Sequence, residues 1–522
     1  MKRKHTQTTA AKITSLPQET GRPAYLHGHI PQSGMPAFTL PYFDLAEKIC
    51  LAVAGAVFAY SCLRAAVISM SHDEALTYLI HIRGSLGDIL GHTLSISSNN
   101  HLLNTLLAKL CVSVFGNSEF VLRMPALLGH ALYLTGVFLI LRSFLKGWPL
   151  LVGFGALATN PFLIDFFSCS RGYGLAVGCM TIGIFFLFMK APIPAIIMLT
   201  LSVLSNFAFL YVYLPVMGLA VAGDLIERWR EAWRTCVAAL ASAILLRIVF
   251  NAGVIKRFQM VVSKWGGTRG FWTDTVTTLL DGVFYGQKYA SSLTIYWSKR
   301  AIAFLCLISI ILTVSAFIKR RVTRFEYRSL ALITALLVII ALGMHAAYAL
   351  FQIKFSVERA AIYLIPLVGI MITLLLALAR QASGLLLRKI GLISLCATLA
   401  VILAHNVACV NLTHFYMWAY DANTKEAVNM VYELSKPKAH SEGEFRIGIN
   451  WHFRPATNYY LCRKRMTWVR RADRKGVDGD YDYYYIWHDQ DKGIIQKRNL
   501  KVIKYFPASN SSFALPQSPS KE

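Results

Sequence analysis

Long apolar runs separated by short charged links fill the chain from Cys50 to Val410. A helix of about 20 apolar residues is long enough to cross a hydrocarbon core of ~30 Å. The pattern predicts eleven membrane spans. They lie near residues 47–70, 119–141, 149–166, 172–189, 192–206, 207–223, 235–254, 301–318, 329–351, 360–379 and 390–408. The chain is therefore predicted to hold one membrane domain, residues 46–410, after a polar leader, residues 1–45.

After the last span, residues 411–522 change to short mixed segments. Residues 445–450 and 481–486 alternate or cluster β-branched and aromatic side chains as strands do, and residues 424–434 have a helical pattern. This segment is predicted to be a small α/β domain. The fold class is thus a polytopic α-helical membrane protein with a small soluble domain at its C-terminal end.

Basic residues occur in every second link between the predicted spans. They are Arg142, Lys146, Lys190, Arg228, Arg230, Arg234, Lys319, Arg320, Arg321, Arg324, Arg328, Arg380, Arg388 and Lys389. Because Lys and Arg favour the cytoplasmic side, these links and the leader are predicted to be cytoplasmic, the first span being a retained signal anchor. The long loops 71–118 and 255–300, and the C-terminal domain, then lie on the other side. Within the first loop, residues 101–115 form an amphipathic pattern typical of a helix at the membrane surface.

Composition supports this interpretation, since 55% of the 522 residues are hydrophobic and only 15% are charged. A net charge of +26 would indicate nucleic acid in a soluble protein. Here the basic residues set orientation and contact anionic lipids, so we expect membrane lipids and no nucleic acid as partners. The ten cysteines show no metal-ligand spacing. Cys409 and Cys462 are both in the exported part, and the sequence leaves open whether they pair.

The sharpest chemical signal is Ser71-His72-Asp73-Glu74-Ala75, where the first span leaves the membrane. Two adjacent carboxylates at this boundary are partly desolvated, and a carboxylate in that setting can act as a general base. A solvated helix cap explains the same residues equally well, because Ser caps helices and acidic residues suit a first helical turn.

Other polar groups gather at the same predicted side of the membrane. They are Asn99-Asn100-His101, Arg123-Met124-Pro125, Asn160-Pro161, Asp165 and Ser170-Arg171-Gly172-Tyr173-Gly174. Each has a structural explanation, such as a helix end at Asn160-Pro161 or close helix packing at the glycines. Their shared location is stronger support for a site than any one of them.

The ordered set of motifs resembles the polyprenyl-phosphate-sugar-dependent glycosyltransferases of the C-type membrane fold. The resemblance rests on Asp73-Glu74, on Asn-Asn-His-Leu-Leu-Asn at 99–104, on Arg123-Met124-Pro125 and on Ser-Arg-Gly-Tyr-Gly at 170–174. The chain looks most like the protein O-mannosyltransferase and aminoarabinose lipid A transferase groups. Beyond residue 180 the resemblance is one of architecture, including Glu358-Arg359.

This resemblance implies transfer of a sugar from a lipid-linked phosphate donor to an acceptor hydroxyl outside the membrane, in a bacterial inner membrane. The acceptor would be a protein, a glycolipid or a polysaccharide. Asp73 would be the base of an inverting reaction, with Glu74 as its neighbour and Asp165 as a second acidic group. Because arginine holds phosphate through a bidentate fork, Arg171 and Arg359 are the preferred phosphate ligands, followed by Arg123 and Lys264. A snorkelling interface anchor is the alternative for each.

The residues expected to contact substrate are His72, Asn100, His101 and Tyr173. The first loop lacks the Asp-x-Asp arrangement of metal-dependent relatives, so the resemblance implies transfer without a metal or other cofactor.

Two other functions fit the same architecture. A flippase or transporter of lipid-linked saccharides would also need many spans, although its polar residues are expected near the bilayer midplane. An oligosaccharide ligase would share the catalytic motif and differ in the shape of its donor cavity.

Overall fold

The computed structural model describes residues 43–94, 99–438 and 444–517. The predicted leader, residues 1–45, lies outside this part of the chain except for residues 43–45, and so it stays a prediction. The first described helix begins after Asp44, whose side chain accepts from the backbone N–H of Glu47 while the Glu47 side chain accepts from Asp44. This reciprocal cap satisfies two backbone donors at the start of the first span.

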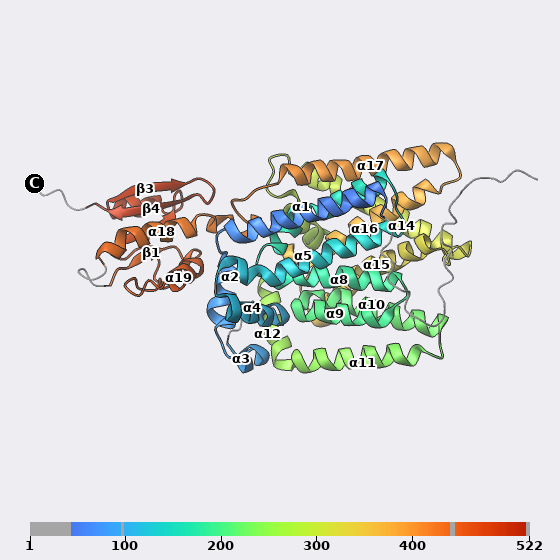
Figure 1. Ribbon diagram of the computed structural model, residues 1–522, viewed down its shortest axis with the longest axis horizontal. Helices are drawn as coiled ribbons and strands as arrows, with labels where there is room; N and C mark the ends of the chain where they lie inside the picture. The colour runs from blue at the N-terminus through green and yellow to red at the C-terminus, as the bar shows by residue number, and fades with distance from the viewer. Residues whose placement is uncertain (1–42, 95–98, 439–443, 518–522) are drawn as a thin grey trace, which may run out of the picture. The chain divides into compact units, whose positions relative to one another are not determined.

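Helices make up most of the chain from Asp44 to Cys409 (Figure 1). They are α1 Leu45–Val67, α2 His72–Leu76, α3 Leu86–Gly91, α4 Leu102–Phe115, α5 Glu119–Arg142, α6 Trp148–Ala158, α7 Pro161–Phe167, α8 Gly172–Phe188, α9 Pro192–Ser205, α10 Leu210–Glu227, α11 Ala232–Val249, α12 Ala252–Trp265, α13 Val276–Phe284, α14 Ser292–Ile318, α15 Phe325–Phe351, α16 Leu364–Arg380 and α17 Leu385–Ala408. A π-helix, η1 Thr77–Ile82, continues α2, and a 3-10 turn, η4 Glu358–Ala361, precedes α16.

Every apolar segment predicted to span the membrane is helical, but not every one is long enough to span it alone. Within the described residues, seven helices are long and apolar enough, and the pair α6 and α7, bent by 59°, makes an eighth if it counts as one span. The other three predicted spans, α8, α9 and α16, have only 14 to 17 residues, or about 21 to 26 Å, so the count of eleven spans stays a prediction. Almost all of α8 is buried, so its apolar residues contact protein instead of lipid and need not match the bilayer thickness.

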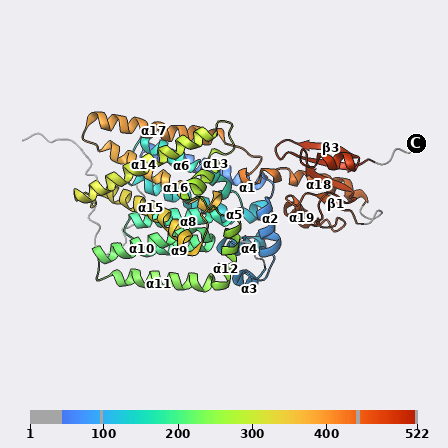
Figure 2. The same cartoon turned by 180° about the vertical axis from the view of Figure 1, so that it is seen from behind.

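Helices α8, α9, α10 and α11 run side by side as successive neighbours in Figures 1 and 2. The contact between α5 and α8 is especially close. A Cβ atom at Gly178 would overlap the backbone carbonyl of Gly129, so glycine is required where these two helices touch. Small residues at such a contact allow the helix backbones to approach, as in other membrane helices.

The C-terminal segment forms the predicted α/β domain. Its sheet has the order β1-β2-β4-β3, from β1 Ile447–Ile449, β2 Tyr483–Trp487, β4 Ser511–Pro516 and β3 Leu500–Phe506. The first pair is parallel and the other two are antiparallel. Its helices are α18 Thr424–Ser435, α19 Arg454–Arg463 and α20 Lys492–Lys497. The predicted strands and the helix near 424–434 correspond to β1, β2 and α18, whereas β3 and β4 were not predicted.

This domain shares its core with the loop that follows α1. Met70, Ala75 and Tyr78 from α2 and its surroundings are buried in one cluster with domain residues that include Phe453 and Tyr460. In Figure 1, α18 and α19 lie next to α2, and α19 packs against it. The soluble domain is therefore part of the structure that positions Asp73.

All ten cysteines lie in the described part of the chain, and all are free. Cys409 Sγ contacts Gln287 Nε2, whereas Cys462 Sγ contacts Arg83, so the two cysteines considered for a disulfide have different surroundings.

Candidate active site

Asp73 lies in the first turn of the short helix α2. The backbone is extended at Ile68 and again at Ser71, which caps α2 through a hydrogen bond with the backbone N–H of Glu74. The Glu74 side chain accepts in return from the backbone of Ser71. The helix-cap interpretation of the Ser71–Ala75 motif is therefore confirmed, although Ser71 and Glu74 are buried and not solvated. The general-base interpretation of Asp73 stays a prediction.

Two arginines from distant segments converge on the Asp73 carboxylate. Arg171 Nη2, just before α8, and Arg359 Nη2, in η4, lie 3.5 and 3.3 Å from the same oxygen, Asp73 Oδ2. Only 2% of the Arg171 side chain is exposed, against 29% for Arg359 and 14% for Asp73. The structure therefore brings the predicted base and both preferred phosphate ligands together, with Arg359 nearest to solvent.

The two guanidinium groups keep Asp73 ionised. Burial alone would raise its pKa, but the charges of Arg171 and Arg359, together with His72 and a hydrogen bond from Asn99, outweigh burial and lower the pKa below its ordinary value. Asn99 also accepts from Arg171 Nη2 at 3.1 Å, so it fixes the arginine as well as the carboxylate. Asn99 belongs to the quoted Asn-Asn-His motif but was not predicted as a site residue.

Glu74 belongs to a separate, fully buried ion pair. Arg123 donates from Nε and Nη2 to its two carboxylate oxygens, each at 2.8 Å. The remaining donors of Arg123 reach the carbonyl oxygens of Ala65, Ile68 and Ser69. All five N–H groups of this guanidinium are used, which leaves none for a phosphate and makes Arg123 the residue that holds the end of α1.

Asp165 is also buried, and its hydrogen-bond partners differ from the partners of Asp73. Its Oδ1 lies 2.5 Å from Arg64 Nη2 and accepts from the Tyr285 hydroxyl at 2.8 Å. Its Oδ2 accepts from the backbone N–H of Tyr416 at 2.7 Å. With both oxygens engaged and 2% of the side chain exposed, Asp165 joins α1, α7 and the segment after α17.

The predicted substrate contacts divide into two groups. His101 and Tyr173 lie side by side, with ring centroids 5.3 Å apart, and Tyr173 hydrogen-bonds to Arg359. His72 is held by the carbonyl of His452 at 2.7 Å and lies edge-on to Trp451. In contrast, Asn100 is buried and its amide nitrogen contacts the carbonyl of Ile89 at 2.8 Å and the ring of His92 at 3.1 Å.

Lys264, the weakest predicted phosphate ligand, lies at the end of α12. Its ammonium group is over the ring of Trp265, which is 71% exposed, and no ion pair or hydrogen bond joins it to a described site residue. An exposed Lys-Trp pair at the end of an amphipathic helix is typical of an interface anchor.

Another carboxyl beside α2 was not predicted from the sequence: Asp421, at the start of the C-terminal domain. Its Oδ2 accepts from the backbone N–H of His72 at 2.6 Å, the first N–H of α2, and its Oδ1 accepts from Thr424 Oγ1. Asp421 is 1% exposed. Burial raises its pKa well above the ordinary value, and the nearby charges of Asp73 and Glu74 add to the shift.

Within the described residues, no group of three or more His, Cys, Asp or Glu side chains is arranged to hold a metal ion. Transfer without a metal stays a prediction.

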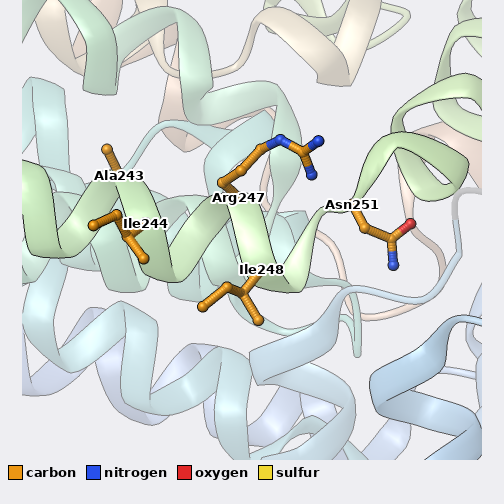
Figure 3. A pocket seen from close by; sticks show the side chains of 5 residues that line it. All are labelled: Ala243, Ile244, Arg247, Ile248 and Asn251. Carbon is orange, nitrogen blue, oxygen red and sulfur yellow. The ribbon is translucent and has the colours of Figure 1, made fainter.

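A pocket away from these residues runs along α11 (Figure 3). Ala243, Ile244, Arg247, Ile248 and Asn251 line it. Ile244 and Ile248 are 51% and 69% exposed, which is typical of a lipid-facing helix surface. The pocket contains no carboxylate, and we assign it no chemistry.

The chain is thus a helical membrane protein in which a charged site follows the first span and is covered by a C-terminal α/β domain. No protein-family model matches it, and no curated protein matches it in sequence. Two solved structures that are similar to it are both of ArnT from Cupriavidus metallidurans. The apo structure is 11% identical over 90% of this chain and 97% of ArnT, with a TM-score of 0.45. The structure with bound undecaprenyl phosphate is 12% identical over 90% and 98%, with a TM-score of 0.37.

Proposed function

We propose that this protein is an inverting membrane glycosyltransferase, which moves a sugar from a polyprenyl-phosphate donor to an acceptor hydroxyl on the non-cytoplasmic side. Asp73 is the base, and Arg171 and Arg359 hold the donor phosphate.

The observation that supports this proposal is an excess of positive charge around one carboxylate. Two guanidinium groups contact Asp73 Oδ2, and the other carboxylate on α2, Glu74, is neutralised by Arg123. Glu358, next to Arg359, is exposed, so water screens its charge. A buried positive charge without a counter-ion is costly, and a phosphodiester supplies the one negative charge that is missing.

The charges stay balanced through the reaction. As the acceptor oxygen bonds to the anomeric carbon, the bond from that carbon to the phosphate oxygen breaks and its electron pair stays on the phosphate. The hydroxyl proton passes to Asp73. The phosphate thus changes from a diester with one negative charge to a monoester with two, while Asp73 loses one. The arginines move their pairing from the carboxylate to the phosphate, and such fixed charges stabilise the charge that develops in the transition state.

The number of available carboxylates supports an inverting mechanism. Retention by two displacements needs a second carboxylate that attacks the sugar, beside the one that handles protons. Glu74 and Asp165 both have their oxygens engaged by arginine and other donors. Of the three acidic residues predicted for the site, only Asp73 is partly exposed, so a single displacement with one base fits the site.

The basic links support the proposed outer location. The link between α14 and α15 contains Lys319, Arg320 and Arg321, all exposed, and it belongs to the set that the positive-inside rule assigns to the cytoplasm. Asp73 follows α1 at the opposite predicted side.

Asp73→Asn tests the proposal in purified full-length protein with a polyprenyl-phosphate sugar and a hydroxyl acceptor. Removing a positioned base is expected to lower kcat by about 10² to 10⁴. Binding of undecaprenyl phosphate, measured separately, is expected to be retained or tightened, because the amide no longer competes for Arg171 and Arg359. Asp88→Asn is the matched control, since Asp88 is in the same loop but its carboxylate bonds only to Ser85 and Thr93 in its own turn. Full activity of Asp73→Asn would contradict the assigned base.

A further inference from the structure

Behind Arg171 lies a group of buried polar side chains with unused hydrogen-bonding atoms, here called the polar cluster and defined as His81, His101, Asn104 and Asn206. They are 1%, 7%, 0% and 3% exposed. Within the part of the chain that the structure describes, both ring nitrogens of His81, Nε2 of His101, both amide atoms of Asn104 and Nδ2 of Asn206 have no partner. Buried polar groups in folded proteins nearly always have partners, so several unused ones together indicate a bound molecule or water.

The members of the polar cluster come from three segments that pack together. His101 and Asn104 are three residues apart at the start of α4, so they share one face of that helix. His81 is on η1, and Asn206 ends α9, and α4 packs against both of these elements.

Gly172 brings this cluster to the candidate site. A Cβ atom at Gly172 would overlap the Ser205 carbonyl and crowd His101, so the chain beside Arg171 touches both the start of α4 and the end of α9. The Nε of Arg171 is buried without a partner as well, while its other nitrogens reach Asp73, Asn99 and Thr77. The unused atoms are thus adjacent to the proposed phosphate ligand.

The polar cluster is uncharged. Burial lowers the pKa of His81 to about 4, with a further effect of His92 and Arg171, and burial together with Arg171 and Arg359 lowers the pKa of His101 well below its ordinary value. Each imidazole is therefore neutral at pH 7 and offers one donor and one acceptor, and each amide offers both. Neutral groups of this kind match hydroxyl groups, which also donate and accept.

We infer that the polar cluster binds the sugar of the donor, and that this sugar is neutral. The inference rests on the proposed function and names the class of its donor. An amino sugar would need a carboxylate, but the sequence has no Asp or Glu between Asp88 and Glu119, and Glu74 and Asp165 are already paired with arginine. An ammonium group there would also be repelled by Arg171. The positive charges of the two arginines are already balanced by Asp73 and the donor phosphate. An acidic sugar would therefore add a negative charge that has no counter-charge.

The test compares three probes on the purified full chain: undecaprenyl phosphate, undecaprenyl phosphomannose and undecaprenyl phospho-4-amino-4-deoxyarabinose. Dissociation constants are measured by native mass spectrometry. The wild-type protein is expected to bind the mannose diester about tenfold more tightly than the aminoarabinose diester, as one unpaired polar group would require. His81→Phe and Asn104→Leu are expected to weaken the mannose diester about tenfold and to leave undecaprenyl phosphate unchanged.

His130→Phe is the matched control. His130 is a fully buried histidine with both nitrogens unused, but it lies in α5 and stacks on Phe167 with ring centroids 4.4 Å apart. It should change neither affinity. A further variant, Asn104→Asp, supplies the missing carboxylate and should shift preference toward the amino sugar.

The outcomes separate this inference from the proposal on which it rests. Equal or tighter binding of the amino sugar by the wild-type protein overturns the neutral-sugar inference. Equal weakening of undecaprenyl phosphate and the mannose diester by His81→Phe and Asn104→Leu shows that the polar cluster holds only water or supports the fold, and overturns it too. If the wild-type protein binds none of the three probes, the glycosyltransferase proposal itself fails.

Discussion

Asp73 and Glu74 are adjacent in sequence and chemically alike, yet their partners give them different roles. Glu74 is paired inside the protein with an arginine whose donors are all used, and it accepts from the backbone N–H of Ser170 as well. Asp73 shares two arginines whose remaining donors can turn to a ligand, and part of it is exposed. One step along a helix turns a side chain by about 100°, which is enough to separate a structural carboxylate from a reactive one.

The charge of Arg359 is expected to set the pH dependence of the base. The pKa of Asp73 lies below its ordinary value of 3.8, so the wild-type kcat/KM should show no loss through this group between pH 7 and pH 4.5. In Arg359→Gln one of the two lowering charges is gone while burial remains, so the pKa rises. The fall of kcat/KM at low pH should then begin at a higher pH, between pH 4.5 and pH 7. Activity should also be lower at every pH. An unchanged pH dependence would contradict the pairing of Arg359 with Asp73.

The same lowered pKa makes Asp73 stabilising above its unfolded pKa, and this contribution is lost as pH falls through the folded value. Between pH 5 and pH 8 this contribution is present in full, so Asp73 should have little effect on how stability changes with pH in that range.

Glu74→Gln is expected to destabilise the protein strongly. The substitution leaves the Arg123 guanidinium buried without its counter-charge, which typically costs about 3 to 5 kcal/mol. Thermal unfolding of the purified protein measures the loss. Glu426→Gln is the matched control, because Glu426 pairs with Lys504 at the surface, and exposed pairs contribute about 0 to 1 kcal/mol. Equal melting temperatures for the two variants would show that the buried pair is not a structural anchor.

At the scale of elements, the contact between α5 and α8 determines where Arg171 lies, because Arg171 immediately precedes α8. Gly178→Ala forces a methyl group against the backbone of Gly129, which cannot rotate away as a side chain would. Overpacking of this kind costs about 1 to 3 kcal/mol, so a lower melting temperature is expected. Gly218→Ala, in α10, meets nothing within 4 Å and should be neutral. A stable Gly178→Ala protein would mean that the helices separate easily.

The elements also show what hydropathy can and cannot predict. The positions of the apolar runs predicted the positions of the helices. Unpaired backbone groups are costly in lipid, so a segment that crosses the membrane must be helical. Hydropathy did not separate lipid-facing α14 from buried α8, since both surroundings select the same apolar residues. The strand β3 was missed because its exposed and buried positions alternate only partly, and three successive residues in it are exposed.

The candidate site could be predicted in part for a related reason. Asp73 and Arg171 stand in recognisable local motifs, and Arg359 follows from the position of its segment. Asp421 and the unused atoms of Asn104 depend on contacts between residues far apart in the sequence, which no local pattern records. The pairing of Asp165 with Arg64 is of the same kind, since the two residues are separated by more than a hundred positions.

At the scale of the whole molecule, the C-terminal domain is bound to the loop that holds the base. Met70 N–H donates to the Tyr460 hydroxyl at 2.8 Å, and Lys425 N–H donates to Ser69 Oγ at 3.2 Å. Lys425 and Arg463 also pair with Glu119, at the start of α5. These contacts, with the shared core, indicate that the domain fixes the position of α2 relative to α5.

Asp421 tests this connection most directly, because its carboxyl group accepts from the first N–H of α2. Asp421→Ala removes the acceptor and lets the turn that carries Asp73 move, so kcat is expected to fall about tenfold, in line with the loss of one buried hydrogen bond. Binding of undecaprenyl phosphate should persist, since Arg171 and Arg359 come from other segments. Asp421→Asn should restore activity, because burial raises the pKa of this carboxyl and so disfavours its charged form, and an amide oxygen accepts from the His72 N–H equally well. Asp489→Ala, at the surface of the same domain, is the control. The two Asp-to-Asn substitutions are therefore expected to have opposite effects: Asp73→Asn loses activity and Asp421→Asn retains it. The reason is that only Asp73 must be charged, because it accepts a proton.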